Sequence, residues 1–138
     1  MHPFRILEHT ADVGFEAFGE TLEQVFANAA CALTHLRVDL DSIAAKEPVS
    51  LSARGSDLPG MLVNWLSEIL YFEDAEDWLF SGFDFPEFNK SSLRAVAHGE
   101  RFDPARHGLK TLVKAVTYHQ LALEEQDGLW RARVFVDI

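Results

Sequence analysis

The spacing of apolar residues changes along this chain, and that change constrains the fold more than any other feature. Residues 13–18 and 130–138 alternate apolar with other side chains, a period of two that is typical of half-buried β-strands. Residues 22–36 and 58–70 repeat apolar side chains every three or four positions, as one face of an amphipathic helix does. Both periods together predict an α+β fold, a single-domain sandwich of two main helices packed on a largely antiparallel β-sheet.

Local signals mark the ends of these segments. Thr21-Leu22-Glu23-Gln24 has the capping-box pattern that opens a helix, and Asp127-Gly128 predicts a hairpin turn before the last strand. Carboxylates crowd residues 73–77 and oppose the helix macrodipole, so we expect a frayed, solvated end to the second helix. Further strand-like patterns cover residues 4–7, 49–53, 78–85, 93–99, 113–119 and 121–123. No repeat or flexible linker interrupts the chain, so one domain is expected over residues 1–138.

Charge and cysteine content limit the partners and the cellular setting. The formal net charge is −10, which disfavours free nucleic acid as the sole partner, so RNA contact is expected only indirectly or weakly. Residues 1–89 carry 4 basic and 16 acidic side chains, whereas residues 90–138 carry 8 basic and 6 acidic ones. Cys31 is the single cysteine, which excludes an internal disulfide and a cysteine-rich zinc site. With no apolar leader or membrane span in the sequence, we expect a cytoplasmic protein.

Three polar motifs carry possible chemistry, although each also has an ordinary structural explanation. Residues 8–14 place carboxylates around a turn before a strand, where such side chains often bond their own backbone. His119 follows a β-branched run beside Tyr118, as a structural pair often does. Asp137 precedes the last residue, Ile138, so a side-chain and a main-chain carboxylate are adjacent. Such carboxylates repel each other unless a cation lies between them. Phosphate-binding glycine loops, Gly-x-Ser-x-Gly elbows, His-Glu-x-x-His pairs and Cys-x-x-Cys pairs do not occur.

Several short motifs occur in an order that resembles one known family. In chain order they are Glu8-His9-Thr10-Ala11-Asp12-Val13-Gly14, then Gly99-Glu100 with Asp103 and His107, then Val113-Lys114-Ala115-Val116-Thr117-Tyr118-His119, then Gly128-x-Trp130 and the closing Val136-Asp137-Ile138. In their order, spacing and overall length, these motifs resemble the archease family across essentially the whole chain. Leu112 departs from the pattern, because relatives often carry an acidic or polar residue there, and the departure concerns a surface contact.

The resemblance implies a protein cofactor rather than an enzyme. Archeases assist an RtcB-type RNA ligase in tRNA splicing and RNA repair, promoting its guanylylation and repeated turnover. The family's metal site corresponds to Asp12, Asp137 and the main-chain carboxylate of Ile138, and we expect His9 and His119 to orient these groups. An oxygen-only set favours calcium, with magnesium or manganese as alternatives. The strand period also predicts that the Ile138 side chain anchors in the core and holds both carboxylates in place.

Two other functions stay open from the residues alone. One is a metal-dependent hydrolase that uses Asp12, Asp137 and His119, against which the sequence offers no clear nucleophile. The other is a general chaperone or adaptor that exposes an apolar patch. If the protein activates a ligase, the densest basic group is expected to face ligase carboxylates or an RNA phosphate. The alternative is that this group is only a solvated strand edge. That group consists of Arg106, His107, Lys110 and Lys114.

Overall fold

The computed structural model describes residues 3–8 and 12–138, which form eight strands, two α-helices and one short 3-10 helix. The first half of the described chain holds β1 (Phe4–Glu8), β2 (Val13–Gly19), α1 (Leu22–Arg37), a 3-10 turn (Leu40–Ser42), β3 (Glu47–Arg54) and α2 (Leu58–Ala75). The second half holds β4 (Trp78–Phe88), β5 (Ser92–Arg101), β6 (Ala115–Val116), β7 (Ala122–Gln126) and β8 (Leu129–Asp137).

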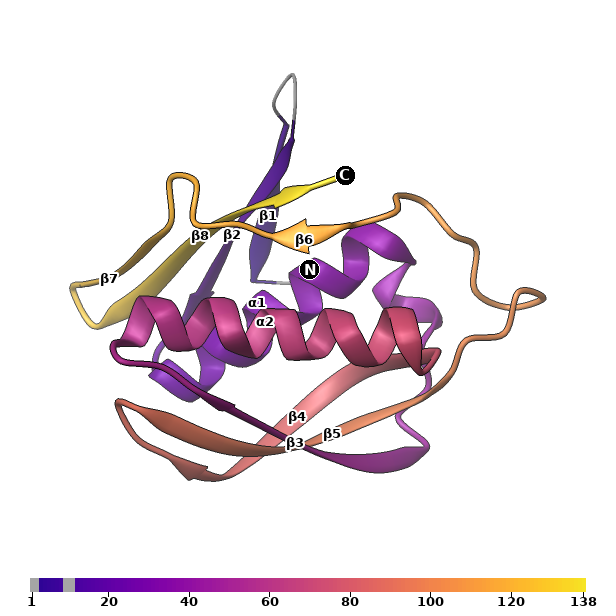
Figure 1. Cartoon of the computed structure of the whole chain (residues 1–138), viewed down its shortest axis with the longest axis horizontal. Helices are drawn as coiled ribbons and strands as arrows, with labels where there is room; N and C mark the ends of the chain where they lie inside the picture. The colour runs from indigo at the N-terminus through magenta and orange to yellow at the C-terminus, as the bar shows by residue number, and fades with distance from the viewer. Residues whose placement is uncertain (1–2, 9–11) are drawn as a thin grey trace.

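The strands form two antiparallel sheets, and both helices lie between them (Figure 1). The first sheet has the order β1-β2-β8-β6, with β7 paired to part of β8, and the second has the order β3-β5-β4. Helix α1 packs on β2 and β4, and α2 packs on β3 and β6, so each helix contacts both sheets. The predicted α+β sandwich is therefore confirmed, with its strands divided between two layers rather than gathered in one.

Helix α1 begins where the capping box predicted, and α2 also begins with a side-chain cap. The Thr21 side chain accepts a hydrogen bond from the Gln24 backbone N–H at 3.1 Å, and Asp57 does the same for Gly60 at 2.7 Å. The buried stripes of the two helices meet in one core, where the Trp65 indole N–H donates to the Phe26 carbonyl at 3.0 Å. Among the described residues, no helix is long and apolar enough to cross a membrane.

Two segments differ from the predictions. Of residues 113–119, only Ala115–Val116 forms a strand, because the chain turns at Gln120, whose φ of 49° lies in the left-handed region. Helix α2 continues through the acidic segment to Ala75, and Glu73 is buried rather than solvated. The second difference creates a buried carboxylate that the acidic run did not predict.

Candidate metal centre

The pairing of β2 with β8 brings the two candidate aspartates to one end of the first sheet. In this antiparallel pair Val13 lies opposite Val136, and this is the last pair of the register. Asp12 and Asp137 each adjoin this pair in the sequence, so residues that are 125 positions apart lie at the same end of the sheet.

Both aspartates belong to the face of this sheet that points away from the helices. Val134 and Val136 point into the core between the sheets, so the alternation of the strand directs Asp137 to the other face. Phe15 and Ala17 are core residues of β2, and the same alternation puts Asp12 on the face of Gly14. Asp12 is half-buried with its Oδ1 atom shielded from solvent, whereas Asp137 is exposed. One carboxylate is thus partly held in the protein and the other is open to a ligand.

Neighbouring strands hold the end of β8 in this position. The Lys114 backbone N–H donates to the Asp137 carbonyl at 2.8 Å. The Thr117 backbone N–H and hydroxyl both donate to the Phe135 carbonyl, at 3.1 and 2.9 Å. On the outer face the Phe135 ring lies over Gly14, where a Cβ atom would come within 2.7 Å of the ring. Gly14 therefore has to lack a side chain for β2 and β8 to pack here.

The side chain of Ile138 does not take the predicted position. Ile138 is 44% exposed, so the prediction that its side chain anchors in the core is wrong. Backbone hydrogen bonds from Lys114 and Thr117, on either side of β6, hold the end of β8 instead. The described residues contain no group of three or more His, Cys, Asp and Glu side chains arranged for a metal. The candidate ligands from the sequence, Asp12, Asp137 and the main-chain carboxylate of Ile138, are all oxygen donors, which would suit a hard divalent cation that completes its shell with water.

The two histidines predicted beside this centre have different outcomes. His9 lies outside the described residues, together with the neighbouring positions 10 and 11 of the motif. The His119 ring contacts the edge of the Phe135 ring, with 5.6 Å between centroids, and its Nε2 atom lies 3.3 Å from the Gln120 amide nitrogen. In both contacts His119 meets neighbouring residues, Phe135 and Gln120, rather than the candidate carboxylates.

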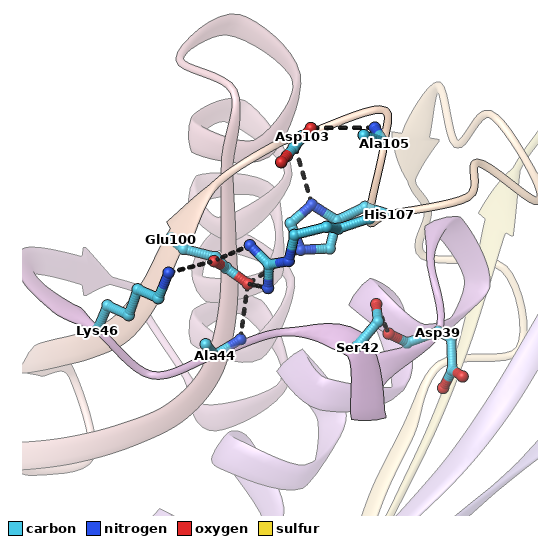
Figure 2. A network of polar contacts seen from close by, with 9 residues as sticks. Asp39, Ser42, Ala44, Lys46, Glu100, Asp103, Ala105 and His107 are labelled. Carbon is cyan, nitrogen blue, oxygen red and sulfur yellow. Dashed lines mark hydrogen bonds and ion pairs between the residues drawn. The ribbon is translucent and has the colours of Figure 1, made fainter.

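A second polar cluster surrounds Glu100 at the end of β5 (Figure 2). Arg106 donates two hydrogen bonds to its two oxygens, at 2.7 and 2.8 Å. The Ala44 backbone N–H donates at 2.7 Å, His107 Nε2 lies at 3.0 Å, and Lys46 Nζ lies 3.7 Å away. The hydrogen bonds from Arg106 hold the pKa of Glu100 well below its usual range, despite burial of the carboxyl. This carboxylate therefore stays charged and ties together two loops.

Two residues of the predicted basic surface, Arg106 and His107, bind Glu100 in this cluster. His107 is only 1% exposed, and its Nδ1 atom accepts the Asp103 backbone N–H at 2.9 Å, so Nε2 carries the proton that faces Glu100. Its ring supports the loop from inside and does not face a partner. The Arg106 guanidinium forms an ion pair with Glu100, although part of its side chain is exposed. Lys110 and Lys114 keep exposed side chains, so of the predicted group these two present charge to solvent.

A third polar cluster lies between the helices and was missed in the sequence. Glu73 accepts the Thr34 hydroxyl at 2.6 Å and Arg37 NH1 at 3.3 Å. Burial raises the pKa of Glu73 to about 7, although these two donors oppose the shift. Burial, with Glu73 nearby, also raises the pKa of Cys31 to about 12, so this thiol is a poor nucleophile. Arg37 continues the buried stripe of Ala29 and Leu33 at intervals of four, the one sequence signal for a buried partner of Glu73.

Comparisons with known proteins agree with this architecture. The model of the archease protein family (MTH1598/TM1083) matches residues 4–138. Similar sequences include the protein archease of Methanopyrus kandleri, 42% identical over 139 residues with 99% of both chains covered. The protein archease of Methanosarcina mazei is 40% identical over 139 residues, covering 98% of this chain and 95% of its own.

Solved structures show the same fold. The solution structure of Methanobacterium thermoautotrophicum protein 1598 has a TM-score of 0.77 at 31% identity and covers 100% of both chains. The crystal structure of a Thermotoga maritima archease, described as a possible chaperone, has a TM-score of 0.63 at 19% identity, covering 96% of this chain and 94% of its own. The fold and its paired chain ends thus define an archease-type α+β protein. This chain belongs to the archease family.

Proposed function

We propose that this protein is a non-catalytic cofactor of an RtcB-type RNA ligase, which it activates from the carboxylate centre at the end of β2 and β8. The observation that supports the proposal is the register of β2 with β8, whose last pair, Val13 with Val136, adjoins both Asp12 and Asp137. These are the residues to which the family resemblance assigns a divalent metal. The proposed setting is the cytoplasm, and the proposed partners are the ligase and, only through it, RNA.

The chain's own groups suggest how the centre works. Asp12 directly precedes β2, and Asp137 ends β8, where it pairs with Ala115 of β6. Because the backbone beside each aspartate is restrained by strand pairing, little conformational entropy is lost when the carboxylates bind a ligand. A bound divalent cation, with calcium preferred over magnesium or manganese, would neutralise these carboxylates and offer open coordination positions to a partner's oxygen atoms. Three adjacent negative groups alone would repel the phosphates of nucleotide and RNA.

The test separates metal binding from ligase activation. Asp12→Asn and Asp137→Asn are compared with Asp127→Asn, a matched change in an exposed hairpin turn of the same sheet. Titration calorimetry with calcium, magnesium and manganese measures binding, and multiple-turnover ligation by a cognate ligase measures activation. We expect both site variants to lose at least about tenfold in metal affinity and most activation, and the control to retain both. Unchanged ligation rates with folded site variants would contradict the proposal.

A second arm tests the main-chain carboxylate. A short Gly-Ser extension after Ile138 converts this carboxylate into a neutral amide, whereas the same extension before Met1 leaves it intact. We expect the C-terminal extension alone to weaken metal binding and ligation. Full metal affinity and activation in the C-terminally extended protein would show that the terminal carboxylate has no part in the site.

A further inference from the structure

The segment between β5 and β6 crosses from one sheet to the other at the end of the molecule where α2 finishes (Figure 1). It has no regular structure over residues 102–114, yet backbone hydrogen bonds anchor it. The Phe102 N–H donates to the Asp77 carbonyl at 2.6 Å, and the Lys110 N–H donates to the Arg37 carbonyl at 2.8 Å. His107 and Val113 are buried, which adds two side-chain anchors.

Two leucines of this anchored segment face outward. Leu109 is 55% exposed and Leu112 is 67% exposed, on either side of the Lys110 anchor. A chain that is fixed at several points cannot turn these side chains inward without breaking the anchors, so their exposure is built into the fold. Fixed, neighbouring exposed apolar side chains are characteristic of an interaction surface.

The leucines border a pocket of about 190 Å³ at the C-terminal ends of the two helices. Its lining residues combine apolar and charged side chains, and they are Arg37, Glu73, Asp74, Asp77, Leu79, Phe102, Leu109 and Leu112. Asp74 also lines the adjoining groove, which contains the exposed Tyr71 and Lys114. The pocket is large enough for a single long side chain, and its rim continues onto an open surface.

The charges that line this pocket are unequal. Arg37 is 6% exposed, and its guanidinium is occupied inside the protein. Its Nη1 atom donates to Glu73 at 3.3 Å, and Nη2 lies 3.9 Å from Asp74. Asp77 lines the same pocket, and both Asp74 and Asp77 are exposed. The accessible charge of the lining is therefore mainly negative, which favours a cation and disfavours a phosphate.

We propose that this crossover pocket binds a peptide segment of a partner protein in which a large apolar residue adjoins a lysine or arginine. The apolar side chain packs between Leu109 and Leu112, and the cation meets Asp74 and Asp77. RNA is not the expected occupant, since its phosphates would meet the same carboxylates.

The experiment uses the full-length ¹⁵N-labelled protein and a defined probe, an acetylated and amidated pentapeptide of alternating leucine and lysine. Two matched probes replace either the lysines with glutamate or the leucines with serine, and a uridine octanucleotide represents RNA. Amide shifts of Leu109 and Leu112 and the Arg37 Nε–H resonance report binding. No metal and no ligase are present, so the outcome is separate from that of the proposed function.

The leucine-lysine probe should move these resonances with a Kd of about 1 mM or tighter, and the other three probes should bind at least about tenfold more weakly. Leu112→Ser and Asp74→Asn, both at exposed positions, should each weaken the peptide about five- to tenfold. The matched changes Leu129→Ser and Asp127→Asn, on β8 and its turn, should have no effect. Absence of shifts at about 1 mM peptide, equal binding of the glutamate probe, or binding of the oligonucleotide at these residues would overturn the proposal.

Discussion

Glu73 and Glu100 are both buried in this protein, but their pKa values move in opposite directions. Glu100 receives two short bonds from Arg106, a backbone N–H from Ala44 and a ring N–H from His107. Glu73 receives one hydroxyl bond from Thr34, one longer bond from Arg37 and one backbone bond from Phe80. Burial penalises both charged forms, so the number and charge of the donors decide which carboxylate stays ionised.

The two glutamates also join different segments of the molecule. A permanently charged Glu100 joins the loop before β3 to the crossing segment that carries Arg106 and His107. Glu73 joins α1 to α2 through Thr34 and Arg37, and its charge changes near neutral pH. The first cluster is therefore expected to be rigid at physiological pH, whereas the second responds to it.

Replacing Glu100 should have the largest effect on stability. Glu100→Ala leaves the Ala44 N–H and the His107 Nε2–H without an acceptor and Arg106 without its partner, so we expect a loss of about 3–5 kcal/mol. Denaturant unfolding at neutral pH measures this loss. The matched change Glu125→Ala, on exposed β7, should cost less than about 0.5 kcal/mol. A loss as small as that of the control would show that the cluster adds no stability.

Glu73→Gln should change the pH dependence more than the stability at one pH. The pKa of Glu73 rises from 4.5 to about 7 on folding, so the folded state binds more protons between these values. The wild-type free energy of unfolding should therefore fall by up to about 3 kcal/mol as the pH rises from about 4.5 to beyond 7. The amide cannot titrate, so this fall should be missing from the variant.

Glu100 provides the control for this pH profile. The pKa of Glu100 is lowered on folding, so its stabilisation is present above 4.5 and is lost as the pH falls below that value. The loss in acid should thus be the same in the wild type and in Glu73→Gln. Parallel profiles of the two proteins between pH 5 and 8 would mean that Glu73 titrates normally.

Periodicity predicted the helices and most strands, because spacing records which face of each element is buried. It did not predict that the strands divide between two sheets, since a buried face does not identify its pairing partner. Among the candidate site residues, Asp12 and Asp137 stood out through the family motifs and their positions at strand ends. Their position at the same end of the sheet depends on the register of β2 with β8, which the local pattern does not contain.

Glu73 and His107 show the same limit at the level of single residues. Glu73 lies within an acidic run that reads as a solvated helix end, and only the tertiary contact with Thr34 and Arg37 buries it. His107 reads as part of a basic surface with Arg106, whereas the short loop after β5 folds its ring back onto Glu100. Side-chain contacts formed on folding decided both cases, so charge counted along the chain was a poor guide to exposure.

Arg106→Lys tests whether paired geometry or charge alone keeps Glu100 ionised. Lysine keeps the positive charge but cannot donate two parallel bonds to the carboxylate. We expect a loss in the free energy of unfolding that is smaller than that of Glu100→Ala, and a pKa of Glu100 that is lowered less than in the wild type. Denaturant unfolding gives the first quantity, and carboxyl NMR titration gives the second. A variant with wild-type stability and titration would assign the effect to charge alone.

The smallest effect is expected at Lys46, the most distant cation of the Glu100 cluster. Its Nζ lies 3.7 Å from the carboxylate, beyond hydrogen-bond length, and its side chain is mostly exposed. Solvent screens such a pair, and ordering the flexible side chain offsets the attraction, so Lys46→Gln should cost less than about 0.5 kcal/mol. The effect should shrink further at about 1 M salt, where the Debye length is about 3 Å. If Lys46→Gln instead costs as much as Arg106→Lys, then summed charge around Glu100 matters more than bonding geometry. In that case, the contrast with Glu73 would have to be explained by the number of cations nearby rather than by the bonds they make.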